Sequence, residues 1–510
     1  MAIQGNRIQA IGKWEELKDL VHPHTRLLDA WGKTLLPGFN DTHIHIWKVG
    51  NLKTGMLDLR GAGSLEEMLS LISDYHNRHP ELEWVTARGF NEASWVQGRL
   101  PDKDDLDRVV KDKPVFVIRT CAHIAIANSL AMELAGIGPR TTPPEGGLIH
   151  TNGDGHPDGI FSETALGLIA RHIPPNSKKT LKEMTLAARE ELYRYGITAA
   201  TDPAVDPILL EAYAEMAAGG GLGFRLDAIP MLLPDGGEQP YPLPALVSGD
   251  FFNIRAVKFF SDGGLSGKTA ALKGYYKDSR EQGILRLEKD QYNRLCRAAM
   301  ERGLGVATHA IGDAAIEFVI AEYRELERDF PGIRKRIEHL GLPEERQLAD
   351  MAANHIAASM QTIFLDELGK NFIKYLDEGY LARCYPVRSV LRQGILLALS
   401  SDAPVVKNLN PLKGAEAAVT RKDAEGNLIA GVEAISMEEA LRAYTLDAAR
   451  LSGTGEFGSL EQGKFADFIL LNRDPLVSPL REFGDIRVEQ TFVDGQCVWK
   501  QDATPAGPGG

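Results

Sequence analysis

The sequence predicts an α/β protein built on a (β/α)₈ barrel, and three observations predict it. Eight short apolar stretches of β-type end in polar residues, helical patterns lie between them, and β-type stretches punctuated by glycine occur at both ends of the chain. The chain has 510 residues, which suits one large barrel with a satellite domain or an insertion. Polar residues at the ends of such strands lie where barrels of this kind place their active sites.

The eight expected strands share an apolar run that is followed by polar residues. In chain order they are LLPGFNDTHIHI, GITAATDPA, FRLDAIPMLL, IRAVKFFSDGG, LGVATHAIGD, KRIEHLGLP, HIAASMQTIF and ILLALSSDAP. Helical patterns such as LKEMTLAAREELYRYG and EKDQYNRLCRAAMERG separate several of them. Repeated βα units of this kind form a parallel barrel, which we assign to residues 36–447.

Both ends of the chain are β-rich, and we expect residues 1–35 and 448–500 to form one composite β-sandwich. NRIQAIGKW and HTRLLDAWGKTLLPG lie near the start, and GSLEQGKFADFILLN and VEQTFVDGQCVWK lie near the end. Val493, Asp494 and Gly495 give a tight hairpin signal in the last stretch. Residues 501–510 are expected to be a disordered tail.

A long segment, residues 51–179, separates the first and second expected barrel strands. It contains its own β-type stretches, EWVTARGF and KPVFVIRTCAH, and is far longer than an ordinary βα loop. We therefore expect an inserted α+β subdomain near the mouth of the barrel. Long insertions of this kind are usually functional, so we also expect it to contribute to the pocket.

Composition and charge argue against several classes of function. The net charge of -13 argues against a general nucleic-acid binder, which would show a basic patch. No apolar run reaches about 18 residues, the length a membrane-spanning helix needs, and the first residues lack a signal-peptide pattern. The four cysteines are scattered without CxxC spacing. We expect a cytoplasmic protein with no nucleic-acid or membrane partner.

Side chains that can bind metals follow several of the expected strands. In a β-strand residues i and i+2 share a face, so His43 and His45 are expected to point the same way. His309, His339 and Asp402 end three later strands. A single histidine is more often a core or loop residue, but repetition at successive strand ends favours a metal site. Imidazole and carboxylate ligands suit zinc and related ions.

Lys258 is the unusual member of this set. An ammonium group would repel a metal, but the surrounding strand is apolar, and burial favours the neutral amine. A neutral lysine amine can take up carbon dioxide as a carbamate, an anionic ligand with two oxygens. The alternative is an ion pair with Asp262, which lies on the same strand face because the two residues are an even number apart.

Taken together, PGFNDTHIH, the lysine strand, the two histidine strands and SSDAP resemble the metal-dependent amidohydrolase superfamily. The stretch GSLEQGKFADFILLNRDPL resembles the closing segment of that superfamily. More narrowly, the chain resembles the amidohydrolase-3 or YtcJ-like branch, which includes N-substituted formamide deformylases. The stretches that carry this likeness are GFNEASWVQGRLPDKDDLD, CAHIAIANSLAM, GIFSETA, VKFFSDGGLSGKTAAL and EALRAYTLDAAR.

The resemblance implies a barrel with a composite sandwich and a binuclear metal site. It places His43 and His45 on one ion and His309 and His339 on the other. It also places carboxylated Lys258 between the ions and Asp402 beside the first. Zinc, with two ions per chain, is the expected cofactor, and other divalent metals also suit these ligands.

Several further residues are candidates for substrate binding. In the insertion, Trp95, His123, Asn128 and Glu163 lie in the branch-specific stretches. Their structural alternatives are aromatic packing for Trp95, a helix cap for Asn128 and a surface salt bridge for Glu163. Four more candidates lie at or near the ends of barrel strands, where they could bind substrate or order the loops: Asp262, Asp313, Gln361 and Arg388.

Three functions follow from these patterns. The first is hydrolysis of a non-peptide C–N bond in a small amide or formamide, with Asp402 moving the proton. The second is deamination or cyclic-amide hydrolysis with the same metal chemistry. The third is a non-catalytic scaffold, against which the intact histidines and Asp402 argue. The expected partner is a small amide-type molecule, and a homodimer is left open.

Overall fold

The computed structural model describes residues 1–92, 95–96, 98–120, 124–144, 147–234 and 239–501. These residues form two compact units. The first contains Met1–Ile46 and Arg189–Gly510, and the second contains Trp47–Ala188. Most of the expected tail, residues 502–510, lies outside the described residues.

All eight expected barrel strands are present in the first unit, and all of their pairings are parallel. With one further short strand, β13, they form two sheets, ordered β13-β12-β11-β4 and β14-β15-β16-β17-β18. Most of their residues are buried, which explains the nearly continuous apolar runs in the sequence. The bounds are β4 Phe39–Asp41, β11 Ile197–Val205, β12 Arg225–Pro230, β13 Phe252–Asn253, β14 Ala256–Phe260, β15 Gly305–Ala310, β16 Lys335–His339, β17 Ile356–Met360 and β18 Leu397–Leu399.

The expected closed ladder of strands is thus found as two sheets, and a few backbone contacts join their edges. On one side Met231, just after β12, forms an isolated parallel bridge with Lys258 on β14. On the other side the amide of Asp402 donates to the carbonyl oxygen of His43 at 2.7 Å. These contacts lie toward the carboxyl ends of the strands, so the edges approach each other where the expected metal ligands lie.

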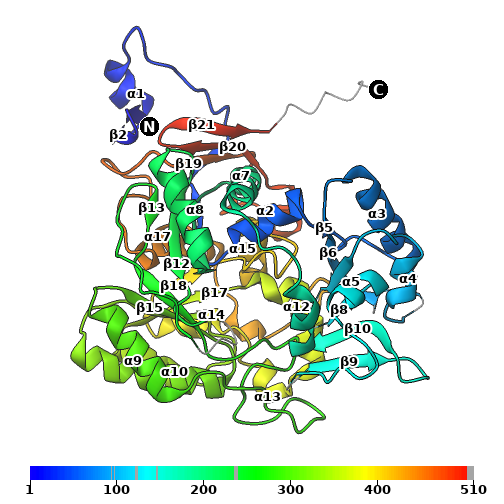
Figure 1. The fold of residues 1–510 in the computed structure, drawn as a ribbon. Helices are drawn as coiled ribbons and strands as arrows, with labels where there is room; N and C mark the ends of the chain where they lie inside the picture. The colour runs from blue at the N-terminus through cyan, green and yellow to red at the C-terminus, as the bar shows by residue number, and fades with distance from the viewer. Residues whose placement is uncertain (93–94, 97, 121–123, 145–146, 235–238, 502–510) are drawn as a thin grey trace. The chain divides into compact units, whose positions relative to one another are not determined.

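Helices follow the barrel strands in the chain (Figure 1), as expected for βα units. Among the described residues no helix is both long and apolar enough to span a membrane. The helices of this unit beyond the terminal segments are α7 Lys178–Arg194, which begins in the second unit, α8 Pro207–Ala218, α9 Lys289–Met300, α10 Asp313–Asp329, α11 Glu345–Ala353, α12 Ile363–Tyr375, α13 Glu378–Leu381, α14 Val387–Arg392, α15 Pro411–Thr420, α16 Met437–Ala443 and α17 Leu446–Leu451, with a 3₁₀ turn at Gly431–Glu433.

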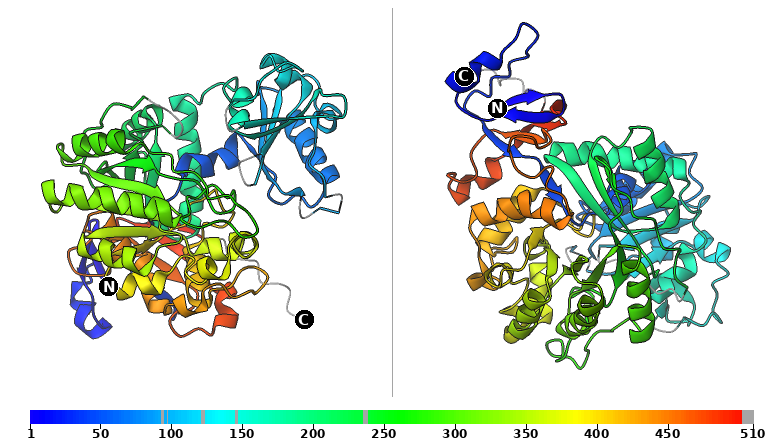
Figure 2. Two further views of the ribbon diagram at one scale, coloured as in Figure 1. Left: turned by 90° about the horizontal axis from the view of Figure 1, so that it is seen from below. Right: turned by 90° about the vertical axis from the view of Figure 1, so that its left-hand side faces the viewer.

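Strands from both ends of the chain share one sheet, ordered β21-β20-β19-β3, and a hairpin, β1-β2, lies beside it (Figure 2). Ile8 of the hairpin packs in one core with Phe468 and Phe492 of the sheet. Asp494 and Gly495 both have positive φ at the β20–β21 turn, the conformation that the hairpin signal predicts. The bounds are β1 Ala2–Gln4, β2 Arg7–Ala10, β3 Thr34–Pro37, β19 Phe468–Leu471, β20 Val488–Val493 and β21 Gln496–Lys500.

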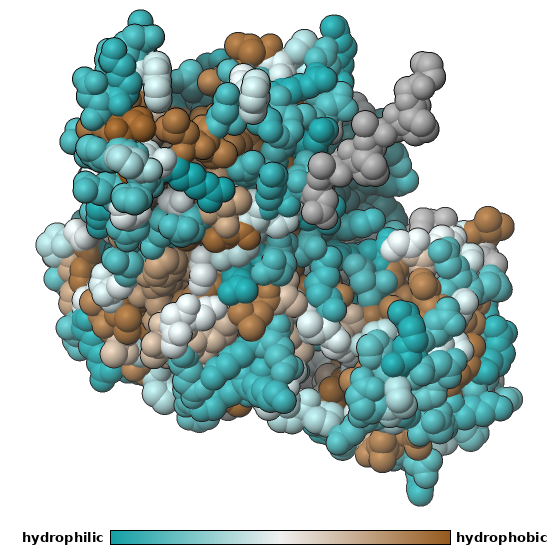
Figure 3. Space-filling view, turned by 90° about the horizontal axis from the view of Figure 1, so that it is seen from above, coloured by the Kyte–Doolittle hydropathy of each residue, from teal (hydrophilic) through white to brown (hydrophobic). Residues whose placement is uncertain are grey.

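The segment between β2 and β3 is much less buried than the sheet. It contains α1 Trp14–Leu17 and a 3₁₀ turn at Lys18–Leu20, neither of which has a buried residue. The side chains of Trp14 and Trp31 are 57% and 82% exposed. In Figure 3, which looks down on the molecule of Figure 1, apolar residues are visible among the polar surface.

Arg225 on β12 joins the barrel strands to the terminal sheet. Its buried guanidinium donates to Asp467 at 2.5 and 2.9 Å and to Asp494 at 2.6 Å. It also lies 3.8 Å from the centroid of the Phe465 ring. Two carboxylates and an aromatic face therefore compensate a charge that burial would otherwise make costly.

We expect Asp467→Asn to lower the free energy of unfolding by about 3 kcal/mol, because it leaves the buried Arg225 charge under-compensated. Urea unfolding followed by circular dichroism measures this. Asp74→Asn, at an exposed position on α3, is the control and is expected to change nothing measurable. Equal stability of the two variants would show that Asp494 alone suffices for Arg225.

The second unit is built on a six-stranded sheet, ordered β5-β6-β7-β8-β10-β9. One core packs α3 against the sheet through Met68 and Ile72, and another contains Phe116 and Phe161. The stretches EWVTARGF and KPVFVIRTCAH contribute β6 and β7 as expected. The bounds are α2 Ile46–Thr54, β5 Leu57–Asp58, α3 Leu65–Arg78, β6 Val85–Phe90, α4 Lys103–Asp107, β7 Val115–Arg119, β8 Ile124–Ala127, α5 Ser129–Leu134, β9 Gly147–Thr151, β10 Pro157–Glu163 and α6 Gly167–Ala170.

In the terminal part of the first unit, one further 3₁₀ helix covers Leu480–Asp485. A shorter one, Thr164–Leu166, follows β10 in the second unit.

Candidate active site

The two histidines of the THIH stretch lie just after a strand, and the expectation that they lie on it is wrong. β4 ends at Asp41, and the following backbone is held by residues from neighbouring strand ends. The amide of Ile44 donates to Thr201 at 3.0 Å, and that of His45 donates to Ala403 at 2.9 Å. The rings nevertheless converge, because the Nε2 atoms of His43 and His45 lie 3.4 and 3.3 Å from one oxygen, Oδ1 of Asp402.

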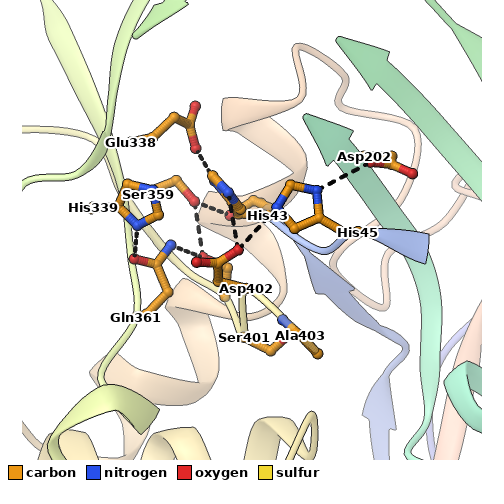
Figure 4. Close-up of polar contacts among 12 residues, drawn as sticks. His43, His45, Asp202, Glu338, His339, Ser359, Gln361, Ser401, Asp402 and Ala403 are labelled. Carbon is orange, nitrogen blue, oxygen red and sulfur yellow. Dashed lines mark hydrogen bonds and ion pairs between the residues drawn. The ribbon is translucent and has the colours of Figure 1, made fainter. Parts of the chain in front are cut away.

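Three buried side chains bring potential metal-binding atoms together. His43, His339 and Asp402 each offer one ligand atom, and these atoms lie within 4.8 Å of one another. They come from the ends of β4, β16 and β18, three strands far apart in sequence (Figure 4). This is the arrangement that side chains at the carboxyl ends of barrel strands are expected to give.

Hydrogen bonds fix the ring orientation of two of these histidines. Nδ1 of His43 donates to Glu338 at 2.6 Å, and Nδ1 of His339 donates to Gln361 at 2.7 Å. Gln361 in turn donates to Ser400 at 2.9 Å. In both rings this leaves Nε2 as the nitrogen that can bind a metal, which is the usual function of such supporting hydrogen bonds.

His45 and His309 border the three-residue cluster. Nδ1 of His45 lies 3.8 Å from Asp202. The ring centroid of His309 on β15 lies 4.4 Å from that of His339, and its Nε2 donates to the carbonyl of Gly263 at 3.1 Å. All four predicted histidines are therefore gathered at one end of the barrel strands.

The charges of the site are strongly coupled. Burial alone would lower the pKa of His43, but Asp402 and Glu338 outweigh it and raise that pKa above its usual value. Burial and the neighbouring histidines, His309 first, hold the pKa of His339 well below its usual value. Burial raises the pKa of Asp402, yet His43 and His45 hold it well below the ordinary range. The site therefore favours an ionised Asp402 beside a neutral His339.

Two candidate ligands sit on an unusual backbone. His339 has φ 73° and Asp402 has φ 56°, in the left-handed region that non-glycine residues rarely adopt. Each such residue costs about 1–3 kcal/mol and persists only where surrounding contacts impose it, often at functional sites. At both strand ends the strained backbone orients the side chain toward the cluster of potential ligand atoms.

Lys258 is completely buried on β14. Its Nζ lies 5.0 Å from the centroid of the Phe260 ring. Burial raises the pKa of Glu338, but Arg336, Lys258 and His43 together hold it well below the usual value. Lys258 is thus close enough to Glu338, which accepts from His43, to favour the ionised form of that carboxylate.

The residues fit a divalent cation. The imidazole nitrogens and the carboxylate are ligand types that zinc accepts. Oδ1 of Asp402 is buried and forms no well-oriented hydrogen bond within the described residues, although two Nε2 atoms lie near it. A cation among these atoms would compensate the carboxylate and bind both nitrogens.

The predicted substrate-binding residues of the barrel lie in three different environments. Gln361 supports His339, as described above. Asp262 accepts from the amides of Ala271 and Gly312, Asp313 accepts from Lys273 and Arg383, and Arg388 is exposed on α14. Asp262 and Asp313 thus order loops of the first unit, and Oδ1 of Asp262 also lies 3.2 Å from Nε2 of His309.

Two of the predicted residues of the insertion form structural contacts within the second unit. Nε1 of buried Trp95 donates to the carbonyl of Ala62 at 3.0 Å. Asn128 is fully buried, caps α5 and accepts from Val115 at 2.9 Å. His123 and the side chain of Glu163 lie outside the described residues.

Comparison with known proteins agrees with this geometry. The sequence pattern of the amidohydrolase family matches residues 26–499. The chain belongs to this family. The YtcJ protein of Bacillus subtilis is 29% identical to this amidohydrolase over 98% of the chain and 95% of its own length. The N-substituted formamide deformylase of Arthrobacter pascens is 28% identical over 97% of the chain and 93% of its own length.

A solved structure of an uncharacterized metal-dependent hydrolase from Pyrococcus horikoshii OT3 is similar over the same span. It superposes with a TM-score of 0.78 at 26% identity and covers 94% of both chains. The amidohydrolase described here therefore has the fold of a metal-dependent hydrolase along nearly its whole length.

Sequence reasoning missed two carboxylates of this amidohydrolase site, Glu338 and Asp202. Glu338 directly precedes His339 in the buried stretch RIEHL, where an unpaired carboxylate would be costly. Asp202 follows the apolar run of GITAATDPA. Both signals are present in the sequence, as acidic residues within or at the end of an expected barrel strand.

We expect Glu338→Gln to weaken metal binding by about tenfold or more, because the residue that orients a metal-binding histidine typically contributes 10–100-fold. Competition with a chromophoric chelator measures the metal affinity. Glu345→Gln, exposed on α11, is the matched control. Unchanged affinity in Glu338→Gln would mean that Glu338 serves only to balance the charge of Arg336.

Proposed function

We propose that this amidohydrolase hydrolyses a non-peptide C–N bond in a small amide or N-substituted formamide. The observation that carries the proposal is the convergence of His43, His339 and Asp402 at the strand ends. The relative named N-substituted formamide deformylase, which matches 97% of the chain, supports the choice of bond. The proposal concerns the substrate class, and the loops and the insertion would set the individual substrate.

We assign the metal-holding role to six residues, with zinc as the expected ion and two ions per chain. They are His43, His45, Lys258, His309, His339 and Asp402. When bound, such ions acidify water and polarise a carbonyl oxygen. Four imidazoles and two anionic groups match the ligand preference of zinc.

Lys258 joins this set as a carbamate. Its neutral amine nitrogen forms a bond to the carbon of carbon dioxide and loses a proton, which leaves an anion with two ligand oxygens. Complete burial favours the neutral amine that this step needs. The carbamate would add a second anionic group to the four imidazoles and Asp402.

Asp402 moves the proton in this proposal. The ionised carboxylate accepts a proton from the attacking water and passes it to the leaving nitrogen, so that the amine departs neutral. Nε2 of His43 and Nε2 of His45 lie 3.4 and 3.3 Å from this carboxylate, so a cation bound by both nitrogens would also hold Asp402. Glu338 and Gln361 keep the neighbouring rings oriented.

The test combines metal analysis with a substrate panel. Purified protein is analysed for metal and assayed against N-alkylformamides, N-alkylacetamides, cyclic amides and aminopurines. We expect stoichiometric metal and amine release from formamides or acetamides, lost on chelation and restored by zinc. Ammonia release from aminopurines alone would identify a deaminase instead, and folded protein without metal would favour a scaffold.

A further inference from the structure

A cavity of about 290 Å³ lies at the ends of the barrel strands opposite the histidines. It is lined by Ala256 and Ile356, the first residues of β14 and β17, whereas His339 is the last residue of β16. Its volume is close to the lower end of the range for small-molecule sites, about 300–1,000 Å³. None of the proposed metal ligands lines it, so it is separate from the metal centre.

One wall of the cavity contains a carboxylate that needs a donor. Asp227 on β12 is buried, and its Oδ1 has no hydrogen-bond partner within the described residues. Burial raises its pKa to about 6, against the opposing effect of Arg255, Arg336 and Arg334. Asp227 is therefore mainly ionised at neutral pH, and a buried acceptor without a donor is costly.

Three guanidinium groups line the same cavity, and they are not equally engaged. Arg336 donates to Glu338 and to the carbonyl of Thr42. Arg255 donates to the carbonyl of Ser452 at 3.1 Å and to Ser248 at 3.2 Å.

The guanidinium of Arg334, unlike its backbone carbonyl, forms no hydrogen bond or ion pair within the part of the chain that the structure describes. Burial lowers the pKa of Arg334 against the opposing effect of Asp227, and the like charges of Arg255 and Arg336 lower it further. Lys335 also lines the cavity, but it pairs with Glu327 as Arg336 pairs with Glu338. Arg255 and Arg334 therefore remain opposite the one carboxylate, so the cavity has excess positive charge and favours an anion. Guanidinium groups bind carboxylates strongly, through charge-assisted hydrogen bonds.

The rest of the lining is largely apolar and includes Ile229, Val306, Met351 and Leu451. We propose that this cavity binds a small zwitterion, an α-amino acid with an apolar side chain. Its carboxylate pairs with Arg334 and Arg255, its ammonium group donates to Asp227, and its side chain packs on the apolar wall. This assignment does not depend on the proposed amide hydrolysis.

The zwitterion supplies both a donor for Asp227 and an anion for the arginines, whereas a ligand with only one of these groups does not. An anion without an N–H donor leaves Oδ1 of Asp227 without a partner. An amine without a carboxylate adds one more cation to a lining that already contains three arginines and Lys335. Each loses one charge-assisted contact, so each should bind more weakly by about tenfold or more.

Calorimetric titration of the metal-loaded protein with three related probes tests this. The probes are L-leucine, 4-methylpentanoate, which lacks the amine, and 3-methylbutan-1-amine, which lacks the carboxylate. We expect saturable one-to-one binding of L-leucine. The Arg334→Ala and Asp227→Asn variants should each bind L-leucine at least about tenfold more weakly.

Arg324→Ala, an exposed arginine on α10, is the matched control and should bind L-leucine as the parent does. Absence of saturable heat with L-leucine at about 10 mM, where even millimolar binding would be visible, overturns the proposal. Binding that persists unchanged in both cavity variants also overturns it, because L-leucine would then occupy another site such as the metal centre. Equally tight binding of 4-methylpentanoate overturns the assignment of a zwitterion.

Discussion

Lys258→Ala is expected to purify with most of its metal lost and with turnover reduced by about 10³-fold or more, since a catalytic ion contributes several kcal/mol. The physical reason is charge. In the proposed site the Lys258 carbamate would supply an anionic metal ligand, and alanine offers no ligand atom. Metal content by mass spectrometry of the purified protein and turnover on an active amide measure the two effects.

Rescue of Lys258→Ala by small carboxylates distinguishes the loss of a metal ligand from general structural damage. Formate, acetate or propionate can enter the space left by the lysine side chain and supply two carboxylate oxygens, so each should restore part of the metal content. Lys374→Ala, an exposed lysine at the end of α12, should retain both metal and activity. Gentle mass spectrometry that finds an unmodified Lys258 in active, metal-loaded protein would rule out the carbamate.

The barrel strands could be predicted because their signal is local. Burial on both faces requires short apolar runs, and each of the eight runs became a strand. The hairpin at Asp494 and Gly495 was predictable for the same reason, since positive φ at both residues depends on residue type. These local signals do not indicate how distant strands pair. The strands form two sheets and not the single closed ladder that was expected.

The end of β4 shows why local pattern was insufficient at the site. Alternation along THIH continues the strand, but Ile44 and His45 donate to Thr201 and Ala403, which lie far along the chain. Nothing near THIH in the sequence indicates those acceptors. The histidines still converge because strand ends of the barrel meet there, so their convergence could be predicted even where the local conformation could not.

The supporting residues were harder still to predict. His43 and Glu338 are separated by 295 positions, and their hydrogen bond exists only because β4 and β16 open onto the same end of the barrel. Asp227 likewise looks like an ordinary strand residue, and only the structure shows it facing three arginines. Residue type and spacing indicate candidate ligands, whereas partners of those ligands depend on the tertiary arrangement.

Asp402→Asn is expected to keep most of its metal and lose turnover by about 10²-fold or more, the usual contribution of general acid–base catalysis. Asparagine has nearly the same size and retains one carbonyl oxygen that can face His43 and His45. Its amide, however, cannot accept and return a proton at neutral pH. Metal content and turnover on the same active substrate are measured together, with Asp74→Asn as the exposed control on α3.

The two possible roles of Asp402, metal ligand and proton shuttle, predict different results for Asp402→Asn. If Asp402 only binds the ion, metal content and turnover should fall together, because each metal-loaded molecule would still have its full activity. If it moves the proton, turnover per bound metal should fall while the ion remains. Near-normal turnover per metal in Asp402→Asn would therefore reject the proton-shuttle role, and the nearest remaining carboxylate beside His45, Asp202, would become the next candidate.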